Sequence, residues 1–411
     1  VTAAPSFVPL APSVVVSGFE HPLIHPTIIP REGRVDLLAL SGTSDDEPVA
    51  TFLLEPPFAH GEHDILDLWD GVSGLRSVSM DDELQLLWEI EDQDADGVAD
   101  FWWGSWLLPG PLMGRVHDPL DAGTALAHLA VNDQGGAMDG EVLAAGFDAD
   151  GDGHTDVVTG NGLGQERYYV HYGPFAGEIP SRRNGDNLQA TELGFAGCNG
   201  LVGFRFLPDA FGPGQPGFST GNRDAIGGCS GSDWQIFSLQ HARGTVDSEP
   251  VATFVGRHEV LAPLPDLTGD GVAEAAWFSP DAQSGWPQVG PLDGEEAVPA
   301  QQEVEVRHGY LTGSIGDVNG DGVDDMAGRW VADEGVVAVY LLSPHAVPVD
   351  LSTGLEVHEH LVHAHALRHG DLDGDGLDDV VFEPVGDAPD EVVFVYYGAD
   401  LTEAWDAPRP R

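Results

Sequence analysis

The sequence predicts an all-β fold: a single-domain, seven-bladed β-propeller over residues 1–411, with four-stranded blades. Three observations lead to this prediction. An acidic nonapeptide recurs along the chain, its copies lie about 57 residues apart on average, and short alternating apolar runs fill the intervals. No segment has a convincing helical period.

The acidic nonapeptide carries oxygen-bearing side chains at its first, third, fifth and ninth positions and glycine at its sixth. Five copies are well preserved: DQDADGVAD from Asp92, DADGDGHTD from Asp148, DLTGDGVAE from Asp266, DVNGDGVDD from Asp317 and DLDGDGLDD from Asp371. The interval between the second and third copies is about twice the others. A further, degenerate copy is therefore expected inside it.

Two degenerate copies bring the count to seven. GFSTGN from Gly217 matches DVVTGN from Asp156, which places one degenerate loop at Asp209. The other begins near Ile28 and keeps three residues of the motif: Glu32, Gly33 and Asp36. Because both have lost most of their oxygen-bearing side chains, we expect them to be ordinary turns.

Each unit has room for four strands, and the chain ends predict how the ring closes. Runs such as Glu166–Tyr172, Val336–Leu342 and Glu391–Tyr397 alternate in the manner of strands. The residues before the first loop and after the last loop each make less than one unit. We therefore predict that a strand from Ser13–Gly18 joins the C-terminal blade and closes the ring.

The charge of the chain excludes several functions. Its 69 acidic and 16 basic residues give a formal net charge of −53, which argues against nucleic-acid binding. All the basic residues are arginines, so lysine Schiff-base chemistry and a P-loop are excluded. The longest apolar runs, such as residues 11–19, are too short to cross a bilayer.

The nonapeptides have the composition of calcium-binding loops. Calcium takes six to eight oxygen ligands, and alternating Asp or Asn side chains converge on one point when glycine lets the chain turn sharply between them. The seventh residue would contribute its backbone carbonyl. The sequence therefore predicts about five calcium ions, held by these residues: Asp92, Asp94, Asp96, Val98 and Asp100; Asp148, Asp150, Asp152, His154 and Asp156; Asp266, Thr268, Asp270, Val272 and Glu274; Asp317, Asn319, Asp321, Val323 and Asp325; Asp371, Asp373, Asp375, Leu377 and Asp379.

Two competing interpretations of these loops fail. An EF-hand needs a bidentate Glu at position 12 and flanking helices, but position 12 is never acidic here and strand-like runs flank the loops. Magnesium is disfavoured because a cage made only of protein carboxylates suits the looser geometry of calcium.

The repeated D-x-D-x-D-G-x-x-D loop followed by an apolar strand resembles the FG-GAP repeat of integrin α-subunit propellers. Bacterial repeats of that family often continue into a YGP strand end, which appears as Tyr172–Pro174 and in part as Tyr397–Gly398. The resemblance covers nearly the whole chain. It implies a secreted or cell-surface, calcium-binding propeller that works in recognition or adhesion.

Other patterns in the sequence are less specific. Five histidines between His358 and His369 could supply a transition-metal site, although a strand partly facing solvent explains them better, and the same holds for His60 and His63. The glycines at 212, 214 and 217 match G-x-G-x-x-G only formally. Tryptophans such as Trp102, Trp103, Trp106, Trp277 and Trp286 are expected mainly between blades, with sugar stacking as the alternative.

Cysteine content and the first residues bear on the compartment. Cys198 and Cys229 could form one disulfide or remain two thiols, and the irregular segment between them is our candidate for a partner-facing surface. The small-residue opening from Val1 is typical of a processed product. The absence of lysine together with abundant Ala, Gly, Val and Asp is typical of a GC-rich bacterial genome.

From sequence we expect a non-catalytic recognition or adhesion module whose ligand is a protein or a glycan. The alternative is a structural subunit that self-associates into a surface layer or fibre. An enzyme acting on polysaccharide or phospholipid is less favoured, because no catalytic motif is present in the sequence.

Overall fold

The protein is described by a computed structural model that covers the following parts of the chain: residues 10–17, 23–29, 36–42, 50–68, 70, 73–76, 87–114, 116–118, 124–130, 139–161, 168–180, 190–193, 201–207, 211, 215–222, 234–240, 252–254, 260–263, 275–279, 284–288, 294–295, 309–330, 337–341, 355–356, 369–382 and 392–406. It is all-β apart from two short helices, α1 (Ile65–Leu68) and α2 (Gly398–Asp406). Neither described helix is long and apolar enough to span a membrane.

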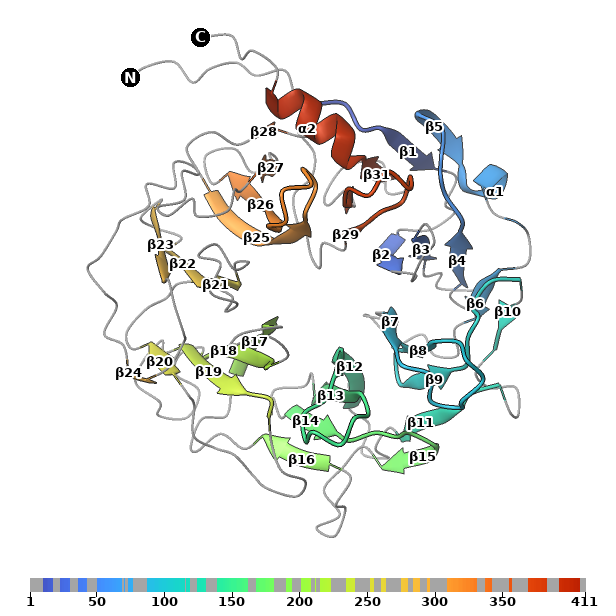
Figure 1. The fold of residues 1–411 in the computed structure, drawn as a ribbon, viewed down its shortest axis with the longest axis vertical. Helices are drawn as coiled ribbons and strands as arrows, with labels where there is room; N and C mark the ends of the chain where they lie inside the picture. The colour runs from blue at the N-terminus through green and yellow to red at the C-terminus, as the bar shows by residue number, and fades with distance from the viewer. Residues whose placement is uncertain are drawn as a thin grey trace.

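The described strands form seven sheets, which we name A to G in the order in which they follow one another in Figure 1. Sheet A contains β29 (His369–Gly370), β30 (Asp379–Phe382), β31 (Val393–Tyr396), β1 (Val14–Ser17) and β5 (Gly61–Asp64). Sheet B contains β2 (Leu23–Ile29), β3 (Leu37–Gly42), β4 (Ala50–Leu54), β6 (Gly74–Arg76) and β10 (Val116–His117). Sheet C contains β7 (Leu87–Ile90), β8 (Asp100–Trp103), β9 (Trp106–Leu108), β11 (Ala127–Ala130) and β15 (Gly177–Pro180).

The remaining sheets continue in chain order around the centre of the molecule (Figure 1). Sheet D contains β12 (Asp139–Phe147), β13 (Asp156–Asn161), β14 (Tyr168–His171) and β16 (Ala190–Leu193). Sheet E contains β17 (Leu201–Leu207), β18 (Gly217–Asn222), β19 (Trp234–Ser238), β20 (Ala252–Phe254) and β24 (Gly294–Glu295). Sheet F contains β21 (Val260–Pro263), β22 (Ala275–Ser279) and β23 (Ser284–Gln288), and sheet G contains β25 (Gly309–Gly316), β26 (Asp325–Trp330), β27 (Val337–Tyr340) and β28 (Leu355–Glu356).

Both ends of the chain meet in sheet A. Strand β1 pairs antiparallel with β31, with Val14 opposite Val395 and Val16 opposite Val393. The prediction that a strand from Ser13–Gly18 joins the C-terminal strands is confirmed. The Ser13 hydroxyl reinforces this seam, since it accepts the Tyr397 N–H at 3.0 Å and donates to the Asp400 carboxylate.

The prediction of four strands per unit is corrected, because four of the described sheets have five strands. Four described sheets have a fifth, outer strand that comes from the following unit and pairs in parallel: β5 on β1, β10 on β6, β15 on β11 and β24 on β20. These outer strands have at most four residues, which is too short for a sequence pattern.

Helix α2 corrects the expectation of a chain without helices. It follows β31, and its Leu401 is fully buried against sheet G, in a cluster with Ile315 and Val318. The Thr402 hydroxyl donates to the Val318 carbonyl at 3.0 Å. The helix therefore crosses onto the preceding sheet, as the outer strands β5, β10, β15 and β24 do in their units.

The apolar core of the described residues lies between neighbouring sheets. Successive side chains of one strand enter opposite interfaces: Trp102 packs between sheets C and D, whereas Phe101 and Trp103 pack between sheets B and C. Val381 of β30 likewise packs between sheets A and B, while Val380 packs between sheets G and A. This two-sided burial explains why consecutive residues of the second strands β8 (Asp100–Trp103) and β30 (Asp379–Phe382) are apolar after the initial aspartate.

Candidate metal centre

Four of the five acidic nonapeptides lie within the described residues, and each joins the first strand of its sheet to the second. The loop from Asp92 joins β7 to β8, the loop from Asp148 joins β12 to β13, the loop from Asp317 joins β25 to β26, and the loop from Asp371 joins β29 to β30. In every case the second strand begins at the ninth residue of the motif. The loop from Asp266 to Glu274 lies outside the described residues.

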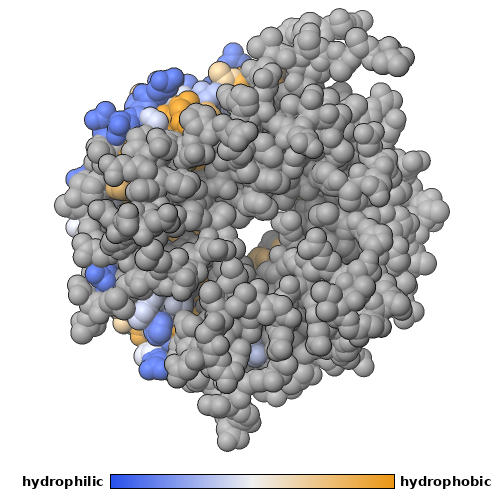
Figure 2. All heavy atoms as spheres, turned by 180° about the vertical axis from the view of Figure 1, so that it is seen from behind, coloured by the Kyte–Doolittle hydropathy of each residue, from blue (hydrophilic) through white to orange (hydrophobic). Residues whose placement is uncertain are grey.

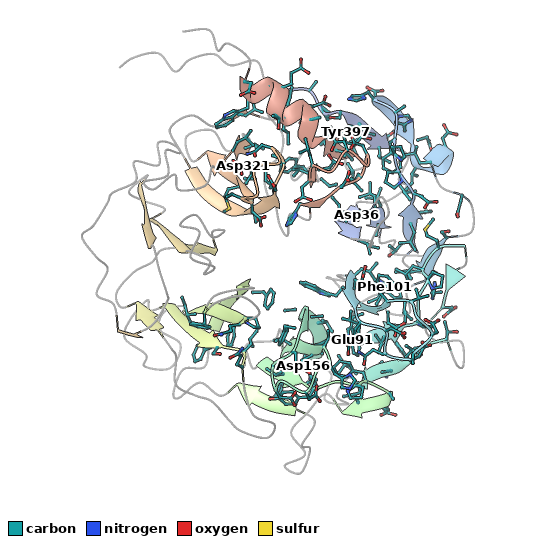
Figure 3. The ribbon with its side chains drawn as sticks, viewed as in Figure 1. Asp36, Glu91, Phe101, Asp156, Asp321 and Tyr397 are labelled. Carbon is teal, nitrogen blue, oxygen red and sulfur yellow. The ribbon has the colours of Figure 1, made fainter. Side chains whose placement is uncertain are left out.

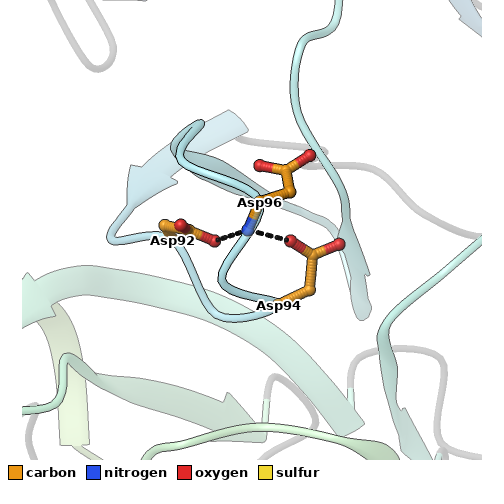
Figure 4. A group of neighbouring side chains, drawn as sticks. All are labelled: Asp92, Asp94 and Asp96. Carbon is orange, nitrogen blue, oxygen red and sulfur yellow. Dashed lines mark hydrogen bonds between the residues drawn. The ribbon is translucent and has the colours of Figure 1, made fainter.

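The same hydrogen bonds recur in all four loops. The first-position carboxylate accepts the N–H groups of the fifth and sixth residues; for Asp92 these are Asp96 at 3.1 Å and Gly97 at 2.6 Å. The third-position side chain also accepts the fifth N–H, as Asp94 accepts that of Asp96 at 3.1 Å (Figure 4). The fifth-position carboxylate accepts the N–H of the seventh residue, as Asp96 accepts that of Val98 at 2.8 Å.

These hydrogen bonds have close counterparts in the other three loops. The first-position bonds are those of Asp148 with Asp152 and Gly153, Asp317 with Asp321 and Gly322, and Asp371 with Asp375 and Gly376. The third-position bonds are made by Asp150, Asn319 and Asp373. The fifth-position bonds join Asp152 to His154, Asp321 to Val323 and Asp375 to Leu377.

Glycine at the sixth position is required by the backbone. Its φ is +88° or +89° in all four described loops, a left-handed conformation that side chains disfavour. The fourth position is left-handed as well and is glycine in three loops, but Ala95 occupies it in the first, with φ +63°. The sharp turn at these two positions brings the acidic side chains to one side of the loop.

The ninth-position aspartates are buried and tie each loop to its sheet. Asp156, which lies fully buried in sheet D (Figure 3), accepts the Ala149 N–H at 2.6 Å and the Gly173 N–H at 2.9 Å. Asp100 and Asp379 make the equivalent pair of bonds, to Gln93 and Gly110 and to Leu372 and Gly398. The second donor of each pair is a glycine that follows the third strand of the sheet. This contact explains the recurring glycine after that strand, including the one in the YGP motif.

Burial among acids raises the pKa of the ninth-position carboxyl groups. The pKa of Asp156 rises to about 7 and that of Asp379 to about 8, and the pKa of Asp100 rises too, because burial disfavours the charged form and nearby aspartates repel it. At the loop surface the Gly97 N–H, the main cause, lowers the pKa of Asp92. Without an ion, burial therefore favours the neutral form of Asp156 and Asp379 more than that of an ordinary aspartate.

The carboxylates converge closely enough to hold an ion. Asp92, Asp94 and Asp96 each offer an oxygen within 4.8 Å of the others, and so do Asp148, Asp150 and Asp156, and Asp371, Asp373 and Asp379. The Asp317 loop has the Asn319 amide at its third position. Three of the four predicted side-chain ligands therefore converge in each of three loops. The first and third positions take part in all three; the third member is the fifth position in the Asp92 loop and the ninth position in the other two.

Such a donor set consists only of oxygen atoms and suits a hard cation with flexible coordination. Calcium fits it better than magnesium, which requires near-ideal octahedral geometry at shorter distances, or than zinc, which prefers nitrogen and sulfur. The predicted ligands Asp96, Asp152, Asp321 and Asp375 are exposed or at the loop tip, where they could move toward an ion.

The degenerate loops differ in how well their predicted register holds. Strand β18 begins at Gly217, as β13 begins at Asp156, which agrees with the alignment of these two segments, whereas most of the loop from Asp209 lies outside the described residues. Ile28 instead lies within β2, opposite Leu38, and β3 begins at Leu37. The loop near Ile28 is therefore displaced by one residue, and Asp36 occupies the eighth position rather than the ninth.

The other candidate sites have mixed outcomes. Trp102 and Trp103 are at most 1% exposed, so they pack between sheets and cannot stack on a sugar, and Trp106 stacks on His128 at 3.7 Å between ring centroids. His60 lies 3.0 Å from Asp400 at the seam, whereas His63 lies 2.6 Å from the Ala59 carbonyl, so the two histidines have different partners. Cys198, Cys229, the glycines at 212 and 214, and the histidine tract before His369 lie outside the described residues.

Three carboxylates for which sequence analysis predicted no contact with a neighbouring loop lie between neighbouring sheets: Glu91, Asp36 and Asp378. Figure 3 shows Glu91 between sheets C and D, near Asp156. Asp378, at the eighth position of its loop, lies beside His369 and the Asp317 N–H. Burial raises the pKa of Asp378, but the hydrogen bond from His369, the charge interaction with His369 and the hydrogen bond from the Asp317 N–H all lower it. The net effect is a pKa below the ordinary value of an aspartate.

No family model matches this chain, and no curated protein matches it.

Proposed function

We propose that the protein is a seven-bladed β-propeller of the FG-GAP type, stapled by about five calcium ions, that works as a non-catalytic recognition or adhesion module outside the cell. The observation that carries the proposal is the acidic loop: four described copies make the same hydrogen bonds at the same place in their sheets. The order of the seven sheets around the centre and the pairing of β1 with β31 support the closed ring.

Calcium has a definite role in this proposal. The residues that would hold it are the first-, third-, fifth- and ninth-position side chains and the seventh-position carbonyl of each loop. A cation there would compensate carboxylates that otherwise repel one another across less than 4.8 Å between their oxygens. Since the loops join strands of one sheet and touch the next sheet, bound ions would stabilise the ring rather than a single turn.

Recognition is favoured over catalysis because the acidic groups of the described loops make structural hydrogen bonds or are among the proposed calcium ligands. The outer strand β5, with sequence GEHD, is short, charged and exposed, which disfavours edge-to-edge pairing of sheets. The described atoms visible in Figure 2 are mostly hydrophilic, with few apolar residues among them. A structural subunit of a surface layer or fibre is the second candidate, and it would need contacts other than that edge.

The test is a thermal melt with simultaneous light scattering, in excess calcium and after chelation. We expect chelation to lower the melting temperature and calcium, but not magnesium, to restore it. A site at a hundredfold excess over its dissociation constant adds about 2.7 kcal/mol, so several sites give a large shift. Asp371→Ala should reduce the shift, whereas Glu403→Ala on the exposed side of α2 should leave it unchanged.

The outcomes separate the candidate functions. An unchanged melt after chelation contradicts the calcium-stapled ring. Calcium-dependent scattering by the folded protein favours the structural subunit, whereas a monomer that is retained on an immobilised glycan or protein favours the recognition module. A search for glycan retention is best made with full-length protein in calcium, with the chelated protein as its control.

A further inference from the structure

The acidic loops of neighbouring sheets are joined by a reciprocal pair of hydrogen bonds. Between sheets G and A, the Asp378 carboxylate accepts the Asp317 N–H at 2.8 Å, and the Asp378 N–H donates to the Asp317 carbonyl at 3.2 Å. Asp317 is the first residue of its loop, and Asp378 is the eighth residue of the next loop around the ring. The bonds thus hold the first proposed ligand of one loop against the end of its neighbour.

The same pair recurs between sheets A and B. The Asp36 carboxylate accepts the Asp371 N–H at 2.9 Å, and the Asp36 N–H donates to the Asp371 carbonyl at 3.0 Å. Asp36 belongs to the degenerate loop, which has lost most oxygen-bearing side chains. That loop has nevertheless kept the carboxylate that reaches its neighbour, so this contact does not depend on a complete metal loop.

Glycine makes room for the incoming carboxylate in both places. A Cβ atom added to Gly316, just before Asp317, would collide with the Asp378 carboxylate and with His369. A Cβ atom added to Gly370, just before Asp371, would collide with the Asp36 carboxylate and with Ile28. The glycine before the loop and the acid from the next sheet therefore form a matched pair.

Between sheets C and D the carboxylate comes from the preceding sheet, C, rather than from the following one. Glu91 directly precedes the Asp92 loop, at the position that Gly316 and Gly370 hold before two other loops. Its carboxylate accepts the Thr155 N–H at 3.0 Å and lies 3.1 Å from His154 Nδ1. Thr155 is the eighth residue of its loop. At this junction the eighth residue carries no carboxylate, and the residue before the preceding loop supplies one.

We infer that Asp378, Asp36 and Glu91 are positioning residues that couple the loops of neighbouring sheets at three junctions, so that the loops joined there are ordered together. Each of these carboxylates fixes the backbone of a loop in a different sheet, and a hydrogen bond to a charged group is stronger than one between neutral groups. If calcium binds as proposed above, its binding to one loop will favour binding to the next, because the first ion orders part of the second site.

The test is amide hydrogen exchange of the full chain carrying Asp378→Ala, first in chelator. The amides to follow are Asp321 and Gly322, which bond to Asp317 and not to Asp378. We expect both to exchange on the order of tenfold faster, although the substitution is in another sheet, while the loops from Asp92 and Asp148 keep their rates. Glu403→Ala, which removes an exposed carboxylate from α2, should change none of these rates.

Gly316→Ala is the second variant. It displaces Asp378 without removing its charge, and it also strains the left-handed backbone of residue 316 (φ +75°), so it should accelerate the same amides. Wild-type rates at Asp321 and Gly322 in a folded Asp378→Ala protein would overturn the coupling. If that protein is unfolded, unchanged rates in Gly316→Ala would overturn it instead. Repeating the measurement in calcium separates the two proposals: if calcium protects no loop even in the wild type, the calcium proposal fails, while the chelator result still decides the coupling.

Discussion

Ala95 is the residue at which the first acidic loop departs from the backbone requirement of the others. The left-handed conformation costs an L-residue roughly 1–2 kcal/mol, whereas glycine adopts it freely at the cost of a more flexible unfolded chain. Ala95→Gly should therefore stabilise the protein by up to about 1 kcal/mol in chemical denaturation. Ala99→Gly, in the same loop at a position without positive φ, should destabilise it by a similar amount, and a stabilising effect of both would contradict the explanation.

His171 makes stability depend on pH. Burial lowers its pKa to about 4, and Thr159 Oγ1 lies 3.0 Å from its Nε2. The unfolded chain binds a proton below about pH 6.5 and the folded chain does not until about pH 4, so this contribution is complete above pH 6.5 and is lost as the pH falls. The loss amounts to about 3 kcal/mol at most.

The measurement is the unfolding free energy of the wild type and of His171→Leu between pH 7.5 and pH 4, at constant calcium. Other groups, including the aspartates of the loops, titrate in both proteins and cancel in the difference. The wild type should lose more stability than the variant as the pH falls below 6.5. Parallel pH profiles would show that His171 is not kept neutral by the fold.

At the scale of the element, the sequence predicted what a local pattern can encode. The nonapeptides predicted the loops between first and second strands, and apolar alternation predicted β14, β27 and β31. It could not predict β10 or β24, which have two residues each, because such strands depend on a neighbouring sheet rather than on their own periodicity. Helix α2 could not be predicted for the same reason, since tertiary contacts such as the packing of Leu401 against sheet G stabilise it.

The types of residue that could bind a metal were predictable from the sequence, but the contacts that hold the loops against neighbouring sheets were not. The pairing of Gly316 with Asp378 is a sequence signal, but it joins positions 62 residues apart and has meaning only when adjacent sheets are known to touch. Ser13 and Asp400 are still farther apart along the chain. Contacts of this kind follow from the pairing of both chain ends in sheet A and from the packing of neighbouring sheets, so they become visible only after the order of the sheets is established.

The pairing of strand β1 with β31 joins the two ends of the chain, and substitutions in β1 can test it. Val14 and Val16 are fully buried between sheets A and B, whereas Val15 on the opposite side of the strand is only partly buried. Asp at position 14 or 16 should cost on the order of 3 kcal/mol, because a charge cannot be buried there without a partner, so β1 should detach. Hydrogen exchange of β31 should accelerate in these variants and much less in Val15→Asp, and equal effects at all three positions would contradict the burial pattern.

At the scale of the whole molecule, the net charge of −53 acts on every sheet at once. Even if five divalent ions were bound, most of this charge would remain, and its self-repulsion destabilises a compact fold. Salt screens charges that are exposed and separated by more than about 8–10 Å, so sodium chloride should raise the melting temperature of the chelated protein between low and physiological ionic strength.

Calcium at the same ionic strength should raise the melting temperature further, because it would also neutralise the buried carboxylates within each loop. The two effects are separable: general screening reaches a plateau set by ionic strength and is reproduced by magnesium, whereas specific binding saturates at a calcium concentration set by the loops and is reduced in Asp371→Ala, which removes a ligand from one loop. A melting temperature that falls as sodium chloride is added would mean that attractive ion pairs, and not repulsion, dominate the electrostatics of the surface.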